Sequence, residues 1–447
     1  MDNKKISELR ELWLKGYNDN KEYVDKRICE GIEKNKKGYC KLLFKDENGQ
    51  PLKNKKVNIN QVKHDFKYGA NMFLLDEFKN EEDNQKYRKI FKEYFNLGTV
   101  PFYWYTLEPE QGKPRYSVDS PKIYRRPAPD LCVEYCEESG IDAKLHCLVY
   151  NGNGFLPSWL PQDDMNAVEE FYENRFREIS ERYSGRMMEF EVINETLCQD
   201  LDNTPNIINK KDDLVEWSFK LARKYFPNET LVINEAQPLQ SSVDGYRNRY
   251  YMQLQKCLSN GAEIDKIGVQ HHLFTGRDTR KNDEAYEAEI RKDAYKVDPM
   301  VSFRGLDIYK NLGLPIEFTE VTIPSFGNSE EDEDFQAEIL KLMFSVWFSH
   351  ESVDTIVYWN TVEGHCFFNE NNCYGALFHN DLSPKKSAIM LKKLFTEIWH
   401  TDLELTTDEN GAVEFRGFYG NYTLSVDGKT KEFGIHKFHN NVHRFSL

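Results

Sequence analysis

Ionisable and amide side chains recur in this 447-residue chain where short apolar segments end. In chain order they are His146, Asn194 with Glu195, Asn234 with Glu235, Gln270 with His271 and His272, Glu320, and Trp359. Two carboxylates that face one another can cleave a glycosidic bond, because one donates a proton to the leaving oxygen while the other attacks the anomeric carbon or activates water. A single glutamate at such a position is more often a salt-bridge or helix-capping residue, so the hypothesis depends on several of these side chains meeting.

The elements that would bring them together are eight short apolar segments with helical segments between them. The apolar segments are residues 66–72, 97–103, 143–150, 188–195, 230–235, 267–274, 315–321 and 353–360. Strands that alternate with helices pair in parallel through right-handed crossovers, and eight such units favour an α/β fold of the (β/α)8 TIM barrel type over residues 64–400. A doubly wound sheet is the alternative, but no GxGxxG or P-loop motif follows any strand. Reactive residues of a barrel gather at the C-terminal ends of its strands, where the residues named above lie.

The two ends of the chain differ from its centre. Residues 1–63 begin with charged, amphipathic helical sequence and continue with two strand-like runs, 41–44 and 56–62, whose turn-rich connection KDENGQPLKN predicts a β-hairpin. Residues 401–447 contain short alternating runs separated by turn signals, which are typical of a small all-β unit. We expect the two flanks to pair into one accessory β-module that caps the barrel, rather than into a separate sugar-binding site.

Charge and composition exclude several classes of partner. The chain carries 59 basic and 74 acidic residues, a net charge of −15, so we expect neither nucleic acid nor an anionic membrane as a partner. No run of about 18 apolar residues and no signal-peptide core is visible, which predicts a cytoplasmic protein, or a secreted one if a leader has been removed. The nine scattered cysteines predict buried thiols in a reducing compartment. The sequence gives no indication of the oligomeric state.

The neighbouring histidines 271 and 272 are compatible with core packing or with half of a metal site. No His-x-His pair follows the first strand and no aspartate ends the eighth, so we expect no metal and no cofactor. Hydrolysis by a pair of carboxylates requires neither.

Six segments, in collinear order within about residues 60–400, resemble motifs of glycoside hydrolase family 10, the retaining β-1,4-xylanases. They are RPAPDLCVEYCEESGIDAKLHCLVYN (126–151), FEVINETL (190–197), IGVQHHLF (267–274), IEFTEV (316–321), TIVYWNTVEGHCFF (355–368) and LSPKKSA (382–388). The resemblance implies a (β/α)8 barrel that cleaves xylan or xylo-oligosaccharides by double displacement, with the two carboxyl groups about 5–5.5 Å apart.

The same resemblance implies a role for each matching residue. Glu195 matches the general acid/base, and Glu320 matches the nucleophile, which needs hydrogen-bond donors to stay ionised. Gln270 and His272 match groups that position these two carboxylates. The substrate-binding residues that the resemblance implies are His146, Tyr150, Asn194, Gln270, His272, Trp359, Phe367 and Tyr103.

The departures from the family pattern lie around the sugar and not at the two carboxylates. Tyr103 stands where a lysine is expected, Tyr150 where a tryptophan is expected, and Thr322 where an aspartate usually partners His272. Each lost polar contact would weaken the binding of xylan by about 1–3 kcal/mol. The same chemistry on a different β-linked oligosaccharide or a small β-glycoside therefore stays open, as does a non-catalytic carbohydrate-binding barrel.

Overall fold

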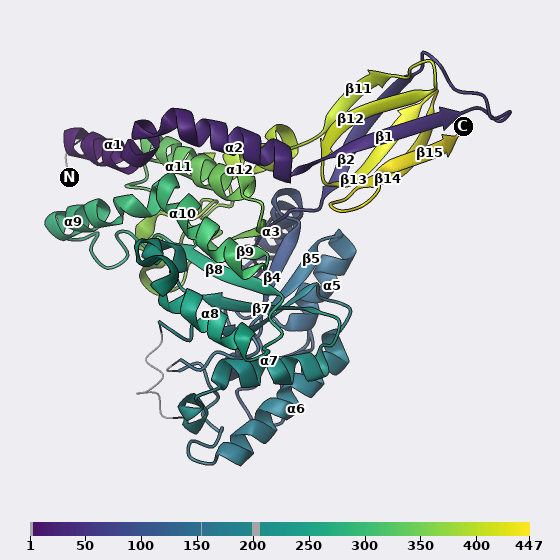
Figure 1. Ribbon diagram of the computed structural model, residues 1–447. Coiled ribbons are helices and arrows are strands. Elements are labelled where there is room, and N and C mark those ends of the chain that lie inside the picture. The colour runs from purple at the N-terminus through teal and green to yellow at the C-terminus, as the bar shows by residue number, and fades with distance from the viewer. Residues whose placement is uncertain (1–2, 153, 199–205) are drawn as a thin grey trace.

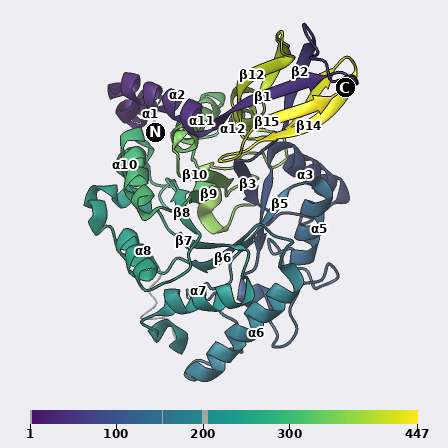
Figure 2. The same cartoon turned by 45° about the vertical axis from the view of Figure 1, so that its right-hand side comes forward.

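The computed structural model describes residues 3–152, 154–198 and 206–447 (Figure 1). Its centre is a closed barrel of eight parallel strands, which confirms the predicted (β/α)8 fold (Figure 2). Each strand overlaps one of the eight apolar segments, and the last strand closes the barrel by pairing with the first. The strands are β3 (Lys67–Asn71), β4 (Leu97–Pro101), β5 (Asp142–His146), β6 (Glu189–Asn194), β7 (Thr230–Glu235), β8 (Lys266–His272), β9 (Ile316–Thr322) and β10 (Val353–Tyr358).

Helices connect these strands, so the loops that leave the C-terminal ends of the strands gather on one face of the barrel. The helix ends follow local rules: α5 has Pro129 in its first turn and ends at Gly140, whose φ of 70° is the left-handed conformation that suits glycine. The α-helices of this region are α3 (Glu81–Tyr94), α4 (Trp104–Leu107), α5 (Pro129–Ser139), α6 (Met165–Tyr183), α7 (Leu214–Tyr225), α8 (Arg249–Ser259), α9 (Asp283–Asp293), α10 (Pro299–Tyr309), α11 (Glu330–Ser349) and α12 (Lys386–Lys393).

The barrel interior contains buried charged residues. Lys144 on β5 forms an ion pair with Glu317 on β9 and lies 3.7 Å from Glu191 on β6. Lys266 on β8 pairs with Glu189 on β6. A buried charge that loses its partner destabilises the fold. These ion pairs therefore hold together the strands β5, β6, β8 and β9, which carry the site.

Two N-terminal helices, α1 (Asn3–Asp19) and α2 (Lys21–Asn35), pack against the barrel, and Figure 1 shows them beside α11. Leu9, Trp13 and Val24 belong to the hydrophobic core of the barrel, and Trp13 Nε1 donates to the carbonyl of Ile290 at 2.9 Å. Residues 1–63, expected to act as one flank, therefore divide between the barrel and the β-module. None of the described helices combines the length and the apolarity needed to cross a membrane.

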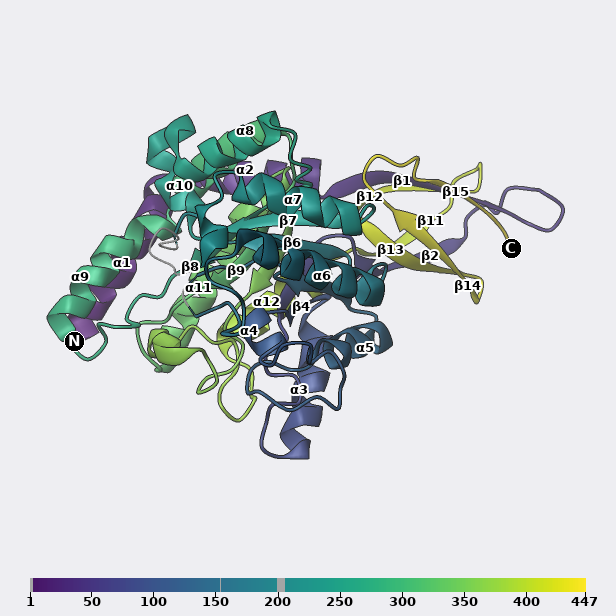
Figure 3. The ribbon, with the colours of Figure 1, turned by 90° about the horizontal axis from the view of Figure 1, so that it is seen from below.

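The accessory β-module is a pair of sheets formed by both flanks, as predicted, and it projects from one side of the barrel (Figure 3). One sheet has the order β12–β1–β15 and the other β11–β2–β13–β14. Apolar side chains from both sheets, including Leu42, Ile59 and Leu424, make a core separate from that of the barrel. The strands are β1 (Lys37–Lys45), β2 (Lys56–His64), β11 (Asp402–Thr406), β12 (Ala412–Phe418), β13 (Gly420–Val426), β14 (Lys429–Ile435) and β15 (Val442–Ser446).

The predicted hairpin between the runs 41–44 and 56–62 is wrong. These runs belong to β1 and β2, which lie in different sheets and pair with strands from the C-terminal flank. Each strand has one apolar face, and both faces become buried when the two sheets pack face to face. A local turn signal carries no information about partners from the other end of the chain, and on its own it predicts a hairpin.

Candidate active site

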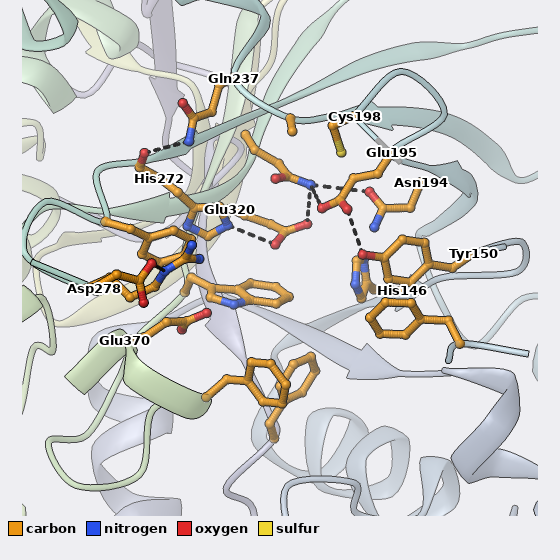
Figure 4. A pocket seen from close by; sticks show the side chains of 18 of the residues that line it. His146, Tyr150, Asn194, Glu195, Cys198, Gln237, His272, Asp278, Glu320 and Glu370 are labelled. Atoms are coloured by element: carbon orange, nitrogen blue, oxygen red, sulfur yellow. Dashed lines mark hydrogen bonds and ion pairs between the residues drawn. The ribbon is translucent and has the colours of Figure 1, made fainter. Parts of the chain in front are cut away.

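Glu195 follows β6, Glu320 lies near the end of β9, and one amide nitrogen joins their carboxylates (Figure 4). Gln270 Nε2, on β8, donates to Glu195 Oε1 at 2.8 Å and to Glu320 Oε1 at 3.0 Å. Glu195 has a φ of 57°, in the left-handed region that residues other than glycine rarely adopt and that clusters at functional sites. The structure thus brings together the two carboxylates and the glutamine that the sequence singled out.

Glu320 is buried, with 4% of its surface exposed, and three donors reach its carboxylate. Besides Gln270, Asn234 Nδ2 donates to Oε1 at 3.0 Å, and His272 Nε2 lies 3.1 Å from Oε2. These donors were expected to keep Glu320 ionised. Burial nevertheless raises its pKa to about 8; His146 opposes this shift, and the charges of Glu195 and Glu191 add to it. The two neighbouring carboxyl groups therefore share a proton near neutral pH.

Glu195 is half-buried and faces the cavity. The hydroxyl of Tyr150 donates to Glu195 Oε2 at 2.6 Å, and the thiol of Cys198 is hydrogen-bonded to Glu195 and to Glu235. Burial, followed by the charge of Glu195, raises the pKa of Tyr150, so the phenol stays a donor. The more exposed carboxylate is the one that a leaving group or a water molecule can reach.

His146, at the end of β5, is held between two partners. Its Nδ1 lies 2.9 Å from Glu191 Oε1 and its Nε2 lies 2.9 Å from the hydroxyl of Tyr103. Burial lowers the pKa of His146, but the Glu191 carboxylate outweighs burial and the net shift is upward. Tyr103 therefore occupies the imidazole nitrogen that a sugar hydroxyl would otherwise contact.

His272 has a hydroxyl, and not a carboxylate, on the side away from Glu320. Its Nδ1 lies 3.0 Å from Thr322 Oγ1. Burial lowers the pKa of His272 to about 4, so the ring is neutral near pH 7 and carries a single N–H. Because a hydroxyl both donates and accepts, Thr322 accommodates either tautomer, and the N–H can face Glu320.

Aromatic rings form one wall of the cavity that contains both carboxylates, a space of about 700 Å³. Phe73 and Trp359 lie with ring centroids 5.1 Å apart, and Tyr150 stacks on Phe155 at 4.1 Å. The sequence-predicted Phe367 also borders the cavity, with 53% of its surface exposed. An apolar wall beside hydrogen-bonding groups suits a sugar ring, whose C–H face packs on aromatic surfaces.

Asn234 is a site residue to which the sequence assigned no role. Its Nδ2 donates to Glu320 and to Asn194 Oδ1, the latter at 3.0 Å, and its Oδ1 accepts from Thr319 at 2.6 Å. Its position at the end of β7 was the available signal. Further residues border the cavity from outside the barrel strands: Phe73, Arg125, Arg126, Phe155, Cys198, Gln237, Phe274 and Glu370.

Two other strand-end candidates point elsewhere. The ring of His271 packs 4.9 Å from Trp347, outside the cavity. Glu235 accepts the backbone N–H of Leu197 at 2.8 Å and so holds the segment that follows Glu195. Both residues therefore have structural roles.

Metal-ligand types cluster once among the described residues, where His146, Cys147 and Glu191 bring ligand atoms within 4.8 Å of one another. Both nitrogens of His146 are already hydrogen-bonded. Burial raises the pKa of the Cys147 thiol well above its usual range, which opposes the thiolate that a metal requires. This cluster does not fit a metal ion.

The chain is similar in sequence to known glycoside hydrolases. A family model described as glycosyl hydrolase family 10 matches residues 60–393. Endo-1,4-beta-xylanase 1 of Arabidopsis thaliana is 25% identical over 425 residues, which cover 92% of this chain and 39% of that protein. The anti-sigma-I factor RsgI6 of Acetivibrio thermocellus is 23% identical over 416 residues, which cover 90% of this chain and 47% of that protein. The chain thus spans less than half the length of these curated relatives.

Solved structures share the barrel. Native xylanase 10B from Thermotoga maritima superposes with a TM-score of 0.58 at 20% identity, covering 75% of this chain and 96% of that one. Xylanase 10B from Thermotoga petrophila, solved in complex with xylobiose, gives a TM-score of 0.57 at 20% identity and covers 74% of this chain and 95% of that one. At this level of identity the likeness shows the fold.

Proposed function

The chain belongs to glycosyl hydrolase family 10, and from that premise we propose that it hydrolyses β-1,4-xylosidic linkages, in xylan or xylo-oligosaccharides, with retention of configuration. Glu320 acts as the nucleophile and Glu195 as the general acid/base. Membership of the family supports the reaction class. The geometry of the cavity supports the assignment of the two roles.

The observation that carries the proposal is the shared contact of Gln270. Because one amide nitrogen reaches an oxygen of each carboxylate, those two oxygens are no more than about 6 Å apart, near the 5–5.5 Å of retaining glycosidases and below the 6.5–9.5 Å of inverting ones. A separation this small leaves no room for a water molecule between the sugar and the second carboxylate. Direct attack by that carboxylate is therefore the supported pathway.

In the first step, an ionised Glu320 oxygen forms a bond to the anomeric carbon while the glycosidic C–O bond breaks, and the proton of Glu195 moves to the departing oxygen. The donors on Glu320 orient it for attack: Asn234 and Gln270 on one oxygen, His272 on the other. In the second step, Glu195 takes a proton from water as the water oxygen attacks the anomeric carbon. The ester bond to Glu320 breaks, and both carboxyl groups return to their starting states.

The cavity wall that faces the sugar supports a substrate range that is narrower than that of an enzyme acting on unmodified xylan. The hydroxyl of Tyr103 is hydrogen-bonded to His146, and the hydroxyl of Tyr150 is hydrogen-bonded to Glu195. Fewer polar groups of this wall are therefore available to bind sugar hydroxyls. Short xylo-oligosaccharides fit this wall, and so does the same chemistry on another β-linked sugar or a small β-glycoside with an apolar aglycone. A panel of aryl glycosides and oligosaccharides separates these substrates.

Replacement of the nucleophile tests the mechanism. Glu320→Ala should abolish hydrolysis of an aryl β-xyloside, and azide should partly restore it with an inverted glycosyl azide as product. Glu414→Ala is the control, because Glu414 lies on β12 of the accessory β-module and does not border the cavity; this variant should keep the reaction. A 2-fluoroglycoside should label Glu320 covalently, as mass spectrometry would detect. Wild-type hydrolysis by Glu320→Ala would refute the mechanism, and an unlabelled wild-type protein that still binds sugar would indicate a non-catalytic barrel.

A further inference from the structure

Two consecutive arginines, Arg125 and Arg126, border the cavity that holds the carboxylate pair. They lie in the loop between α4 and α5, and only 8% and 9% of their surfaces are exposed. Arg125 has a φ of 63°, so this segment adopts a left-handed backbone conformation that an arginine rarely takes. The proposed mechanism uses neither residue.

Neither of these two guanidinium groups forms an ion pair within the described part of the chain. Arg125 Nη1 donates to the carbonyl of His365, and Arg126 Nη1 donates to the carbonyl of Arg125 at 2.8 Å. The Nε atoms of both are buried and have no acceptor among the described residues. A different arginine of the same cavity, Arg277, has an ion pair with Asp278 at 3.0 Å.

Two carboxyl groups in the surroundings of the pair, Glu77 and Glu370, do not replace an ion pair. Glu77 accepts the backbone N–H of Arg125 at 3.1 Å, and burial raises the pKa of Glu77 to about 7. Glu370, which also borders the cavity (Figure 4), has its pKa raised by burial. Burial, and then the charge of Arg126, lower the pKa of Arg125. Two adjacent guanidinium groups in such a setting favour a ligand that brings a negative charge.

Arg126 packs against two of the aromatic residues that line the cavity. The guanidinium of Arg126 lies 4.2 Å from the ring centroid of Tyr103 and 5.0 Å from that of Phe73. Phe73 in turn packs on Trp359, and Tyr103 is hydrogen-bonded to His146. A substrate seated against Trp359 therefore has the arginines within reach of its next sugar or substituent.

We propose that Arg125 and Arg126 bind the carboxylate of a uronic acid carried by the substrate next to the bond that is cleaved. A guanidinium presents N–H donors in a planar fork that matches the two oxygens of a carboxylate. The proposal rests on the proposed function, since it names a substrate class for the same cavity. It makes the arginine pair a determinant of specificity, separate from the residues that act on the anomeric carbon.

A matched pair of substrates tests the proposal: a xylo-oligosaccharide that carries glucuronic acid, and the methyl ester of the same compound. The ester differs from the acid by the lost charge and by one added methyl group. In the wild-type protein, kcat/KM for the acid should exceed that for the ester by at least about tenfold, which corresponds to about 1.4 kcal/mol. Arg126→Gln should remove most of this preference, Arg126→Lys should keep part of it, and Arg277→Gln should leave the acid-to-ester ratio unchanged.

Calorimetric binding of the acid and the ester to Glu320→Ala separates this proposal from the mechanism. Glu320→Ala should bind the acid more tightly than the ester, and the double variant Glu320→Ala/Arg126→Gln should lose this preference. That result supports the arginine site even if the wild-type protein turns over no substrate. Absence of turnover would overturn the proposed function alone. Equal affinity for acid and ester in the wild-type protein, or a preference that survives Arg126→Gln, would overturn the arginine site while leaving hydrolysis of neutral substrates intact.

Discussion

Replacing Thr322 by aspartate would place a carboxylate beside Nδ1 of His272, where a hydroxyl now lies at 3.0 Å. An ionised carboxylate accepts only, so it requires a proton on Nδ1. The opposite nitrogen can then donate to Glu320 only if the ring becomes an imidazolium. Thr322→Asp therefore tests whether the hydroxyl keeps His272 neutral and, through it, sets the pKa of the nucleophile.

The magnitudes favour the imidazolium. Burial lowers the pKa of His272 from 6.5 to about 4, which corresponds to about 3 kcal/mol against the charged ring. A carboxylate within hydrogen-bonding distance raises a histidine pKa by about 1–3, or about 1.4–4 kcal/mol. Asp at position 322 and an ionised Glu320 would together supply about 3–8 kcal/mol, which equals or exceeds the cost. The pKa of Glu320 should then fall from about 8 to between about 5 and 7, because a cation replaces a neutral donor.

The assay is the pH dependence of kcat/KM for an aryl β-xylobioside between about pH 5 and pH 10. Because the pKa of Glu320 is raised to about 8, the carboxyl pair of the wild-type protein keeps its proton below about pH 8. The pair loses this proton as the pH rises through that value. The enzyme then lacks the acid that protonates the leaving group, and kcat/KM falls. Thr322→Asp should move this alkaline limb downward by at least about one pH unit. Thr322→Val, which removes the hydroxyl without adding charge, should leave the limb in place and lower stability by about 1–3 kcal/mol. A limb that stays near pH 8 or moves upward in Thr322→Asp would refute the reasoning.

Two further variants test the surroundings of the carboxylates. Tyr150→Phe removes the hydroxyl that donates to Glu195 at 2.6 Å and should lower kcat/KM for unactivated oligosaccharides by about 10- to 100-fold. The loss should be smaller for nitrophenyl glycosides, because their leaving groups need little acid assistance. An equal loss for both substrates in steady-state assays would contradict a role in proton transfer. Lys144→Met removes the lysine that Glu317 and Glu191 share and leaves them with Lys266 and His146 as their remaining partners. It should lower the free energy of unfolding by about 3–5 kcal/mol; an unchanged urea midpoint would show that these carboxylates do not depend on Lys144.

The barrel could be predicted from the sequence because its signal is local and repeated. Each of its strands is an apolar run bounded by helical sequence, and the parallel, right-handed connection leaves few other arrangements. The pairing of β1 and β2 could not be predicted in this way. Their alternating pattern shows which face is buried, but the partners come from residues 402–446, and register between such distant strands depends on tertiary packing.

The same distinction applies to the site. Glu195, Gln270 and Glu320 lie at strand ends, where the barrel fold itself brings side chains together, so their position along the chain was informative. Arg125 and Arg126 reach the cavity from a loop whose path depends on its packing against Phe73 and Tyr103. In the sequence they are two adjacent charges before a proline, a pattern that also describes an ordinary solvated surface.

Position 103 connects substrate choice with the protonation of the nucleophile. A lysine there, as the family resemblance leads one to expect, would set a cation beside the carboxylates, whereas Tyr103 brings a neutral hydroxyl whose pKa burial raises well above its usual range. The arginine in contact with this side chain is Arg126, whose guanidinium lies 4.2 Å from the centroid of the Tyr103 ring, whereas the Tyr103 hydroxyl is hydrogen-bonded to His146. A cation displaced in this way stabilises an ionised Glu320 less, which agrees with a pKa of about 8, and it leaves a guanidinium available for a charge on the substrate. Burial is the main cause of the raised pKa of Glu320, and the tyrosine at position 103 alters the sugar wall without adding a cation that would oppose this shift.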